Sequence, residues 1–241
     1  MIYIASVSWG KDSTAMLLRL LSENKPLDEV VFFDTGMEFQ AIYDVRDFVV
    51  PMLAEAGIKY TELIPRESFL YNMLERPITK RTGEKVKGRG WCGGPCRWGT
   101  SEKMRTIDKY AKAKNATVYV GIAADEKNRL ERLERWKRAP LADWAMTGGD
   151  CIQYCYDHRI YWYESAPGGE QIRLYGILDR VSCWCCRNKN LKELRNIYKI
   201  LPEYWQKLRD LQAVIKQPMK GYYKGDPVGV FELEERFKAG N

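Results

Sequence analysis

The sequence predicts an α/β fold with an open, mostly parallel sheet and helices on both of its faces. Strand-like and helix-like segments alternate through the first third of the chain. The segment 30–33, VVFF, is short, apolar and rich in β-branched and aromatic residues, which is typical of a parallel strand buried on both faces. An apolar run at 2–5 leads through a Gly-containing hinge into a segment with helical spacing.

The individual elements follow from the same patterns. Strands are expected at 2–6, 30–33, 59–64 and 117–122, and helices at 12–22, 39–55, 100–114, 147–156, 191–200 and 202–215. Pro51 is expected to kink or split the second helix, and Thr147 with Asp150 resembles a capping box. The Gly-rich, basic segment 79–99 is expected to be a loop. Roughly the last 25 residues are expected to form a loosely packed tail.

Bulk properties narrow the classes of function. The chain has 241 residues, of which 45% are hydrophobic and 29% charged, as in ordinary globular proteins. Without a long apolar stretch or a secretory signal pattern, no membrane association and a cytoplasmic location are expected. The net charge of +7 favours an anionic partner such as a nucleotide or a nucleic acid. With only one histidine, His158, a zinc site has at most one imidazole ligand.

The hinge SVSWGKDS at residues 6–13 has the chemistry of a phosphate-binding loop. A strand that meets a helix there exposes backbone N–H groups and the positive end of the helix dipole. Gly10 allows close approach of an anion, Ser8 and Ser13 offer hydroxyl donors, and Lys11 adds a charge. The G-x-x-x-x-G-K-[ST] loop does not fit, because Asp12 follows Lys11. The alternative is a plain turn with Ser8 or Asp12 as the helix cap.

Residues 8–13 resemble the S-x-G-K-D-S loop of the PP-loop superfamily, whose members bind adenine nucleotides and commonly cleave ATP between the α and β phosphates. Trp9 stands where that pattern usually has Gly. The segment 34–36, DTG, follows the second strand and is similar to the corresponding D-T-G of the phosphoadenosine phosphosulfate (PAPS) reductase family. Carboxyl ends of neighbouring parallel strands meet at one ligand-binding edge.

A third stretch, GIAADEKNR at 121–129, resembles the G-I-R-x-D-E-x-x-R stretch of the same family, with Ala123 in place of the first Arg. Together the three matches cover roughly residues 4–150. The resemblance implies nucleotide- or phosphate-binding roles for Ser6, Ser8, Trp9, Gly10, Lys11, Asp12, Ser13, Asp34, Thr35, Gly36, Gly121, Asp125, Glu126, Arg129 and Arg132, and catalytic roles for Lys11, Asp12 and Ser13. Asp34 is expected to hold a ribose hydroxyl or Mg²⁺. Alternatively, the arginines belong to a solvated basic helix face.

The cysteines fall into two close groups separated by a long gap. Cys92 and Cys96 lie in WCGGPCRW, and Cys183, Cys185 and Cys186 lie in SCWCCR. This spacing predicts a tetrathiolate metal site of Cys92, Cys96, Cys183 and Cys186, with Cys185 as a spare or a replacement for Cys183. Free buried thiols are the alternative.

Either zinc or an iron–sulfur cluster accepts four thiolates. The resemblance favours a [4Fe–4S] cluster, with Zn²⁺ as the alternative, since several family members carry a cluster. Cluster-bearing reductases of the family, however, use a Cys-Cys pair upstream of Cys-x-x-Cys. Cys151 and Cys155 share a helix face and are expected in the core, and His158 is expected to be structural or exposed.

Sulfonucleotide reductases of the family attack sulfur with a cysteine in E-C-G-x-H, whereas this sequence has no cysteine after Cys186. The first hypothesis is therefore ATP-dependent adenylation with pyrophosphate release, coupled to sulfur transfer, as in tRNA thiolation and DNA phosphorothioation enzymes. PAPS or APS reduction and a non-catalytic nucleotide sensor are the other two hypotheses. The ligand is expected to be ATP or an adenylyl sulfate nucleotide with Mg²⁺, and the acceptor tRNA or DNA. Residues 1–150 are expected to form the nucleotide-binding domain and 151–241 a Cys-bearing helical part packed on it as one unit.

Overall fold

The structure, a computed structural model, describes residues 1–92, 94 and 96–240. The chain forms two compact units. The first contains Met1–Asp34, Gln40–Ile64 and Glu102–Trp162, and the second contains the described residues of Thr35–Phe39, Pro65–Ser101 and Tyr163–Asn241. The division at residue 150 stays a prediction.

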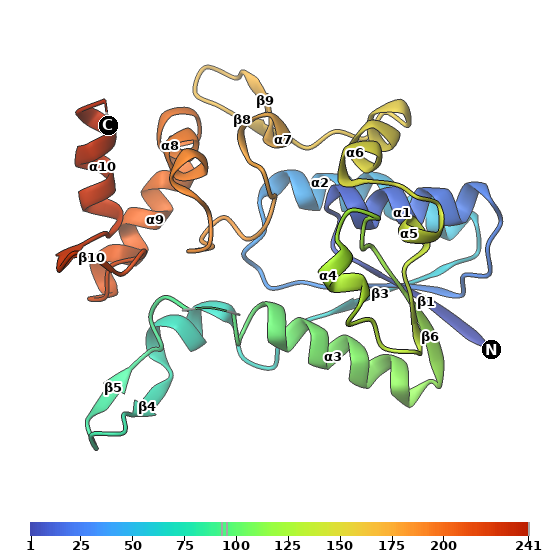
Figure 1. Cartoon of the computed structure of the whole chain (residues 1–241), viewed down its shortest axis with the longest axis horizontal. Helices are drawn as coiled ribbons and strands as arrows, with labels where there is room; N and C mark the ends of the chain where they lie inside the picture. Colours follow the sequence, from blue (N-terminus) through green and yellow to red (C-terminus); the bar gives the residue numbers. More distant parts are fainter. Residues whose placement is uncertain (93, 95, 241) are drawn as a thin grey trace. The chain divides into compact units, whose positions relative to one another are not determined.

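The first unit is built on a five-stranded sheet (Figure 1). Its strands are β1 (Ile2–Val7), β2 (Glu29–Phe33), β3 (Lys59–Leu63), β6 (Ala116–Val120) and β7 (Lys137–Arg138), in the order β3-β2-β1-β6-β7. All neighbouring strands are parallel. The predicted open parallel sheet is therefore confirmed.

Helices cover both faces of this sheet, with α1 (Lys11–Ser22) and α2 (Gln40–Glu55) on one side and α3 (Thr100–Ala113) on the other (Figure 1). On the α3 side, Ile4, Val31 and Val118 pack against Ile107 and Ala111. Because β2 is covered on both faces, all five of its residues are buried. The helix α6 (Gly148–Asp157) packs along α1, and α4 (Lys127–Leu130) and α5 (Pro140–Asp143) complete the unit.

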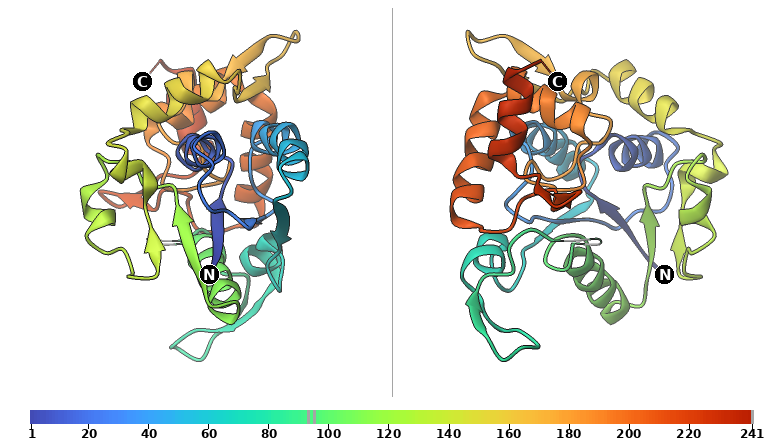
Figure 2. Two further views of the ribbon diagram at one scale, coloured as in Figure 1. Left: turned by 90° about the vertical axis from the view of Figure 1, so that its right-hand side faces the viewer. Right: turned by 60° about the vertical axis from the view of Figure 1, so that its left-hand side comes forward.

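The second unit combines a helical cluster with short hairpins. Helices α8 (Leu191–Ile200), α9 (Pro202–Val214) and α10 (Val230–Lys238) pack on one another (Figure 2). A π-helix, η1 (Tyr71–Glu75), precedes the hairpin of β4 (Pro77–Thr79) and β5 (Lys85–Lys87). The other elements are β8 (Tyr163–Ser165), β9 (Gln171–Arg173), α7 (Leu174–Ile177), β10 (Tyr222–Tyr223) and β11 (Asp226–Pro227).

Three expectations about local structure are wrong. The segment 79–99 is not all loop, because it contains β5, which pairs with β4; residues 93 and 95 of that segment lie outside the described residues. The C-terminal segment is not a loose tail, because Val230, Leu233 and Phe237 of α10 are buried on one helix face. Pro51 does not split α2, which runs unbroken from Gln40 to Glu55 with Pro51 exposed; a kink at this position stays a prediction.

Among the described residues, no helix combines the length and the apolarity that crossing a membrane requires.

Candidate functional site

The loops after β1, β2 and β6 lie at one edge of the sheet. Val7 at the end of β1 pairs with Phe32 of β2, and Ser6 pairs with Val120 at the end of β6. Because these strands are parallel, the segments that follow them leave from the same carboxyl edge. The first of them is the hinge predicted to bind phosphate.

The hinge presents an open helix N-terminus. Gly10 is the N-cap of α1 in extended conformation, and no side chain caps the helix. The Ser13 hydroxyl instead donates to the Gly10 carbonyl at 3.1 Å and accepts the backbone N–H of Ser8 at 3.0 Å. The hydroxyl of Ser8 lies 3.2 Å from that of Ser13. The first turn of α1 thus carries no side-chain cap, as the phosphate-site interpretation requires.

Trp9 holds the loop in a conformation that normally favours glycine. Its φ of 58° is left-handed, which costs a non-glycine residue about 1–2 kcal/mol. Its indole is fully buried, with ring centroids 6.3 Å from Phe32 and 6.0 Å from Tyr60. Its carbonyl accepts a 2.7 Å hydrogen bond from the Trp162 indole N–H. Burial and this bond offset the backbone cost, so Trp substitutes for the usual Gly.

Lys11 is tied to the start of α6. Its Nζ lies 2.5 Å from Asp12 Oδ1 and donates to the Gly148 carbonyl at 2.9 Å. The backbone N–H of Gly148 in turn donates to Asp125 Oδ1 at 3.1 Å. The α6 start is fixed by the predicted Thr147–Asp150 capping box. Through Gly148, the structure thus brings Asp125 close to Lys11 and Asp12, from which it is more than a hundred residues away in sequence.

Gly121, the first residue after β6, lies in close contact with the hinge. A Cβ at this position would lie 2.7 Å from both Cα and N of Ser13. Only glycine allows this approach, so residue 121 shapes the loop through the absence of a side chain.

The charged residues after Gly121 include the two arginines expected to bind phosphate, Arg129 and Arg132. Arg129 is more than half exposed, and its Nη1 donates to both carboxylate oxygens of Glu126 at 2.6 and 2.7 Å. Glu126 also accepts the backbone N–H of Ala123 at 3.3 Å. Arg132 is exposed, and only its backbone N–H, bonded to Arg129, is described in a contact. Phosphate binding by the two arginines stays a prediction.

The DTG segment is divided between the two units. Asp34 directly follows β2 in the first unit and accepts a 2.8 Å hydrogen bond from the Tyr43 hydroxyl. Thr35 and Gly36 belong to the second unit, where Thr35 donates to Glu38 at 3.2 Å and Gly36 has a φ of 72°.

Five of the seven cysteines line one cavity of the second unit. This cavity has a volume of about 80 Å³ and is walled by Phe69, Met73 and Trp91. Its cysteines are Cys92, Cys96, Cys183, Cys185 and Cys186. Within the described residues, none of the five forms a disulfide. The structure therefore brings the two cysteine groups together, as their spacing predicts.

Burial raises the pKa of three of these thiols. Burial, and then the neighbouring Cys92, raises the pKa of Cys96 to about 11. Burial and then Cys186 raise the pKa of Cys185. Burial and then Glu38 raise the pKa of Cys183, whose Sγ lies 3.7 Å from Glu38 Oε1. A thiol so placed is a poor nucleophile by itself but loses its proton to a metal.

Sequence reasoning missed three polar residues around this cavity. Besides Glu38, the buried Lys189 donates to the Arg180 carbonyl and to Ser182 Oγ, both at 3.4 Å, and its pKa is lowered by burial. Lys220 donates to the carbonyl oxygens of Arg187 and Lys189 at 2.6 and 2.9 Å. Lys189 is three residues after Cys186, so its nearness in sequence to the CWCC segment could have identified it as a neighbour of the cysteines.

The donor set fits a thiolate-bound metal, because five sulfur ligands line a single cavity with buried positive charge nearby. Across the described residues, no three Cys, His, Asp or Glu side chains are already arranged as a metal centre. The choice of ligands, and of cluster or zinc, stays a prediction. Cys151 and Cys155 are fully buried in the first unit, as expected. His158 is exposed, with Nδ1 2.8 Å from the Tyr154 carbonyl oxygen.

The fold and the hinge define an α/β protein of the nucleotide-binding type. The model of the phosphoadenosine phosphosulfate reductase domain matches residues 2–162. The chain therefore belongs to the PAPS reductase family, and the resemblance found in its sequence is confirmed.

Two curated relatives match at lower identity. An uncharacterized protein of Methanocaldococcus jannaschii is 25% identical over 220 residues, covering 86% of this chain and 46% of that protein. The phosphoadenosine 5'-phosphosulfate reductase of Xanthomonas axonopodis pv. citri is 26% identical over 170 residues, covering 66% of this chain and 63% of that protein. The chain thus spans less than two thirds of the length of either relative.

Among solved structures, the U34-tRNA thiolase NcsA from Methanococcus maripaludis with its [4Fe-4S] cluster is similar with a TM-score of 0.46 at 12% identity. The match covers 99% of this chain and 71% of that chain.

Proposed function

We propose that this chain binds ATP at the 6–13 hinge and transfers the adenylyl group to a substrate, releasing pyrophosphate. The observation that carries the proposal is the N-terminus of α1, which no side chain caps and which bears Gly10, Lys11 and Ser13 at the carboxyl edge of the sheet. First-turn amides, a helix dipole, a hydroxyl and an ammonium together suit the negative charge of an oligophosphate.

The same groups favour the transition state of adenylyl transfer. An oxygen of the substrate attacks the α phosphorus, a new P–O bond forms, and the bond between the α phosphorus and the bridging oxygen breaks. Pyrophosphate leaves with that electron pair, so negative charge grows on the leaving group. Amides of α1 and Lys11 stabilise this charge in place. Lys11 would exchange its contact with Asp12 for a phosphate oxygen, while Gly148 keeps its position.

The cysteine cavity supports sulfur transfer as the second half of the reaction. Cys92, Cys96, Cys183 and Cys186 would hold the metal group, with Cys185 as the substitute, and Lys189 would offset thiolate charge. A [4Fe–4S] cluster bound by three of these thiolates would supply sulfide. In the overall reaction, a C–S bond would form at the adenylated carbon while its C–O bond breaks and AMP leaves. Mg²⁺ is proposed as the counterion of the phosphates.

The test measures ATP affinity by titration calorimetry in the presence of Mg²⁺, for the wild type and for Lys11→Ala. We expect Lys11→Ala to weaken ATP binding by about tenfold or more, since a charge-assisted contact is worth about 1.5–3 kcal/mol. Lys192→Ala removes an exposed lysine of α8 and serves as the matched control. Equal ATP affinity of Lys11→Ala and wild type would mean that the hinge is not the phosphate site.

Sulfonucleotide reduction is the second candidate, favoured by the family and by the Xanthomonas relative. It predicts sulfite from PAPS or APS when a thiol reductant such as thioredoxin is supplied. Formation of AMP and pyrophosphate from ATP without sulfite production supports the adenylation proposal, whereas stoichiometric sulfite reverses the ranking. Tight ATP binding without either product would favour a nucleotide sensor.

A further inference from the structure

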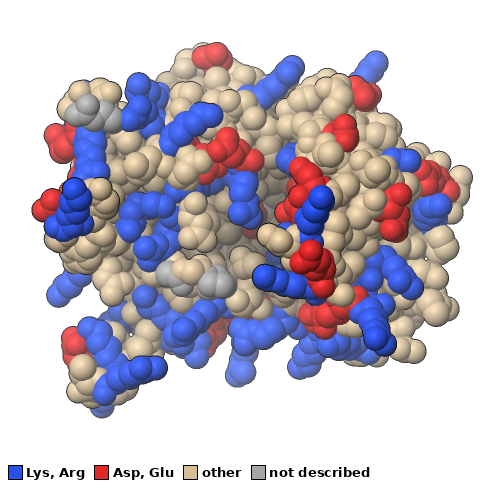
Figure 3. Space-filling model, viewed as in Figure 1, with Lys and Arg blue, Asp and Glu red and all other residues tan. Residues whose placement is uncertain are grey.

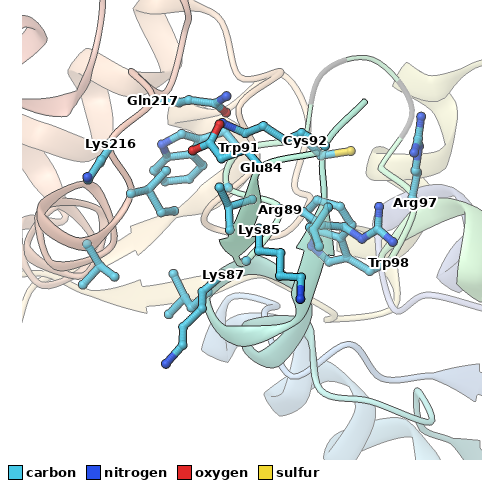
Figure 4. Close-up of a pocket in the computed structure, with 18 residues that line it drawn as sticks. Glu84, Lys85, Lys87, Arg89, Trp91, Cys92, Arg97, Trp98, Lys216 and Gln217 are labelled. Carbon is cyan, nitrogen blue, oxygen red and sulfur yellow. The ribbon is translucent and has the colours of Figure 1, made fainter. Parts of the chain in front are cut away.

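A second, much larger cavity lies beside the cysteine cavity in the second unit. Its volume is about 730 Å³, and its walls come from the β4–β5 hairpin, the segment that follows it and residues 214–217 after α9 (Figure 4). Trp91 and Cys92 line both cavities. Anything bound in the larger cavity therefore lies next to the cysteine cluster.

The walls of this cavity are strongly basic. Its cationic residues are Lys80, Lys85, Lys87, Arg89, Arg97 and Lys216, and its one acidic residue is Glu84. Lysine and arginine side chains gather over the hairpin, at the lower left of Figure 3. Lys80 is neutralised by Glu84 at 2.8 Å. In the described part of the chain, no carboxylate forms a salt bridge with any of the other five.

Several of these charges are regularly spaced. Lys85 and Lys87 are two residues apart on β5, about 6.8 Å along the strand, and both are exposed. Arg89 follows at the same sequence interval beyond Gly88. Evenly spaced cations suit a polyanion whose charges recur along a chain, more than a single compact anion.

The rest of the cavity is apolar. Val86, Ile78 and Ile215 contribute aliphatic surface, and Trp91 and Trp98, 4% and 5% exposed, form aromatic walls. The volume lies in the range of cavities that hold a small organic ligand. It accommodates a nucleobase, whereas a double helix is too wide to enter. The Gln217 side chain, labelled in Figure 4, adds one amide to the lining.

The base of the hairpin is anchored rather than free. The N–H groups of Gly88, Arg89 and Gly90 donate to carbonyls of Arg76, Asn72 and Met73 at 2.9–3.1 Å. A Cβ on Gly88 would lie 2.4 Å from the Met73 carbonyl oxygen, so the chain passes in close contact there. The cations are consequently presented from a fixed support, which lowers the entropic cost of binding.

We propose that this basic cavity binds single-stranded nucleic acid, with phosphates along Lys85, Lys87 and Arg89 and one base between the apolar walls toward Cys92. The proposal that nucleic acid binds here rests on the cavity alone. Identifying the ligand as the sulfur acceptor rests on the proposed function, and places one base of the strand next to the thiols.

The test follows the anisotropy of fluorescein-labelled 20-nucleotide single-stranded RNA and DNA against the full-length protein, without ATP, over a range of salt concentrations. The variant K85E/K87E/R89E should bind at least about tenfold more weakly, and its log Kd against log salt slope should fall by about 2, since each lost phosphate contact contributes about 0.7. K192E/K199E/K224E makes the same charge change on exposed lysines elsewhere in this unit and should keep the wild-type slope.

Thermal unfolding checks that both triple variants are folded, and Lys87→Ala alone should lower the slope by about 0.7. Three results overturn the proposal: equal affinity and slope for the two triple variants, a dinucleotide that binds as tightly as the 20-nucleotide strand, or a blunt duplex that binds as tightly as the single strand. Since ATP is absent, failure of adenylation leaves this measurement unchanged, and the two proposals fail separately.

Discussion

Replacing Gly121 with alanine tests whether its close contact with Ser13 shapes the hinge at residues 6–13. The added Cβ would lie 2.7 Å from Cα and N of Ser13, about 0.7 Å short of an ordinary 3.4 Å contact. Its neighbours are backbone atoms, so no rotamer change relieves the clash. The start of α1 must move by a comparable distance, which displaces the amides that are proposed to bind phosphate.

We expect Gly121→Ala to weaken ATP binding by about tenfold or more, equivalent to about 1.4 kcal/mol, and to lower the free energy of unfolding by about 1–3 kcal/mol. Calorimetric titration with ATP and urea unfolding measure the two effects. Gly176→Ala is the matched control, because a Cβ there meets only Arg173 Cβ at 4.0 Å. Wild-type ATP affinity in a folded Gly121→Ala protein would refute the reasoning.

Three more predictions concern the loop, the core and the thiols. Trp9→Gly should cost about 2–4 kcal/mol of unfolding free energy, since loss of a buried indole outweighs the relieved backbone strain; unchanged urea stability would contradict this. Burial raises the pKa of Glu29, but hydrogen bonds from Lys114, Thr61 and other neighbours outweigh burial and lower it to about 2. The resulting stability exists above pH 4.5 and is lost as pH falls toward 2, so the destabilisation by Glu29→Gln should be larger at pH 7 than at pH 3 in urea unfolding. Cys186→Ser should reduce iron bound after anaerobic reconstitution, measured chemically, whereas Cys151→Ser should bind the wild-type amount.

Elements with a long or strongly apolar pattern were predictable. The buried run in β2 and the helical spacing in α1 identified the parallel sheet, and the Thr147 capping box located α6. The errors fell on short or charged elements. In β5 only Val86 lies between two lysines, too little alternation to indicate a strand before its pairing with β4 is known. The i, i+3, i+7 pattern of Val230, Leu233 and Phe237 was present, but the nearby Gly and Pro residues obscured it.

The sequence by itself determined the family and the position of the strand–turn–helix hinge, because a strand, a Gly-Lys-Asp-Ser turn and a helix are local features of consecutive residues. Only the tertiary structure decided that Trp162 secures the carbonyl of Trp9 and that Gly121 touches Ser13, whereas the spacing of the cysteines already indicated that their two groups come together. Each of these contacts joins residues about 90 or more positions apart, or depends on the space left by a missing side chain. Pairwise proximity of that kind arises from packing, which local pattern does not encode.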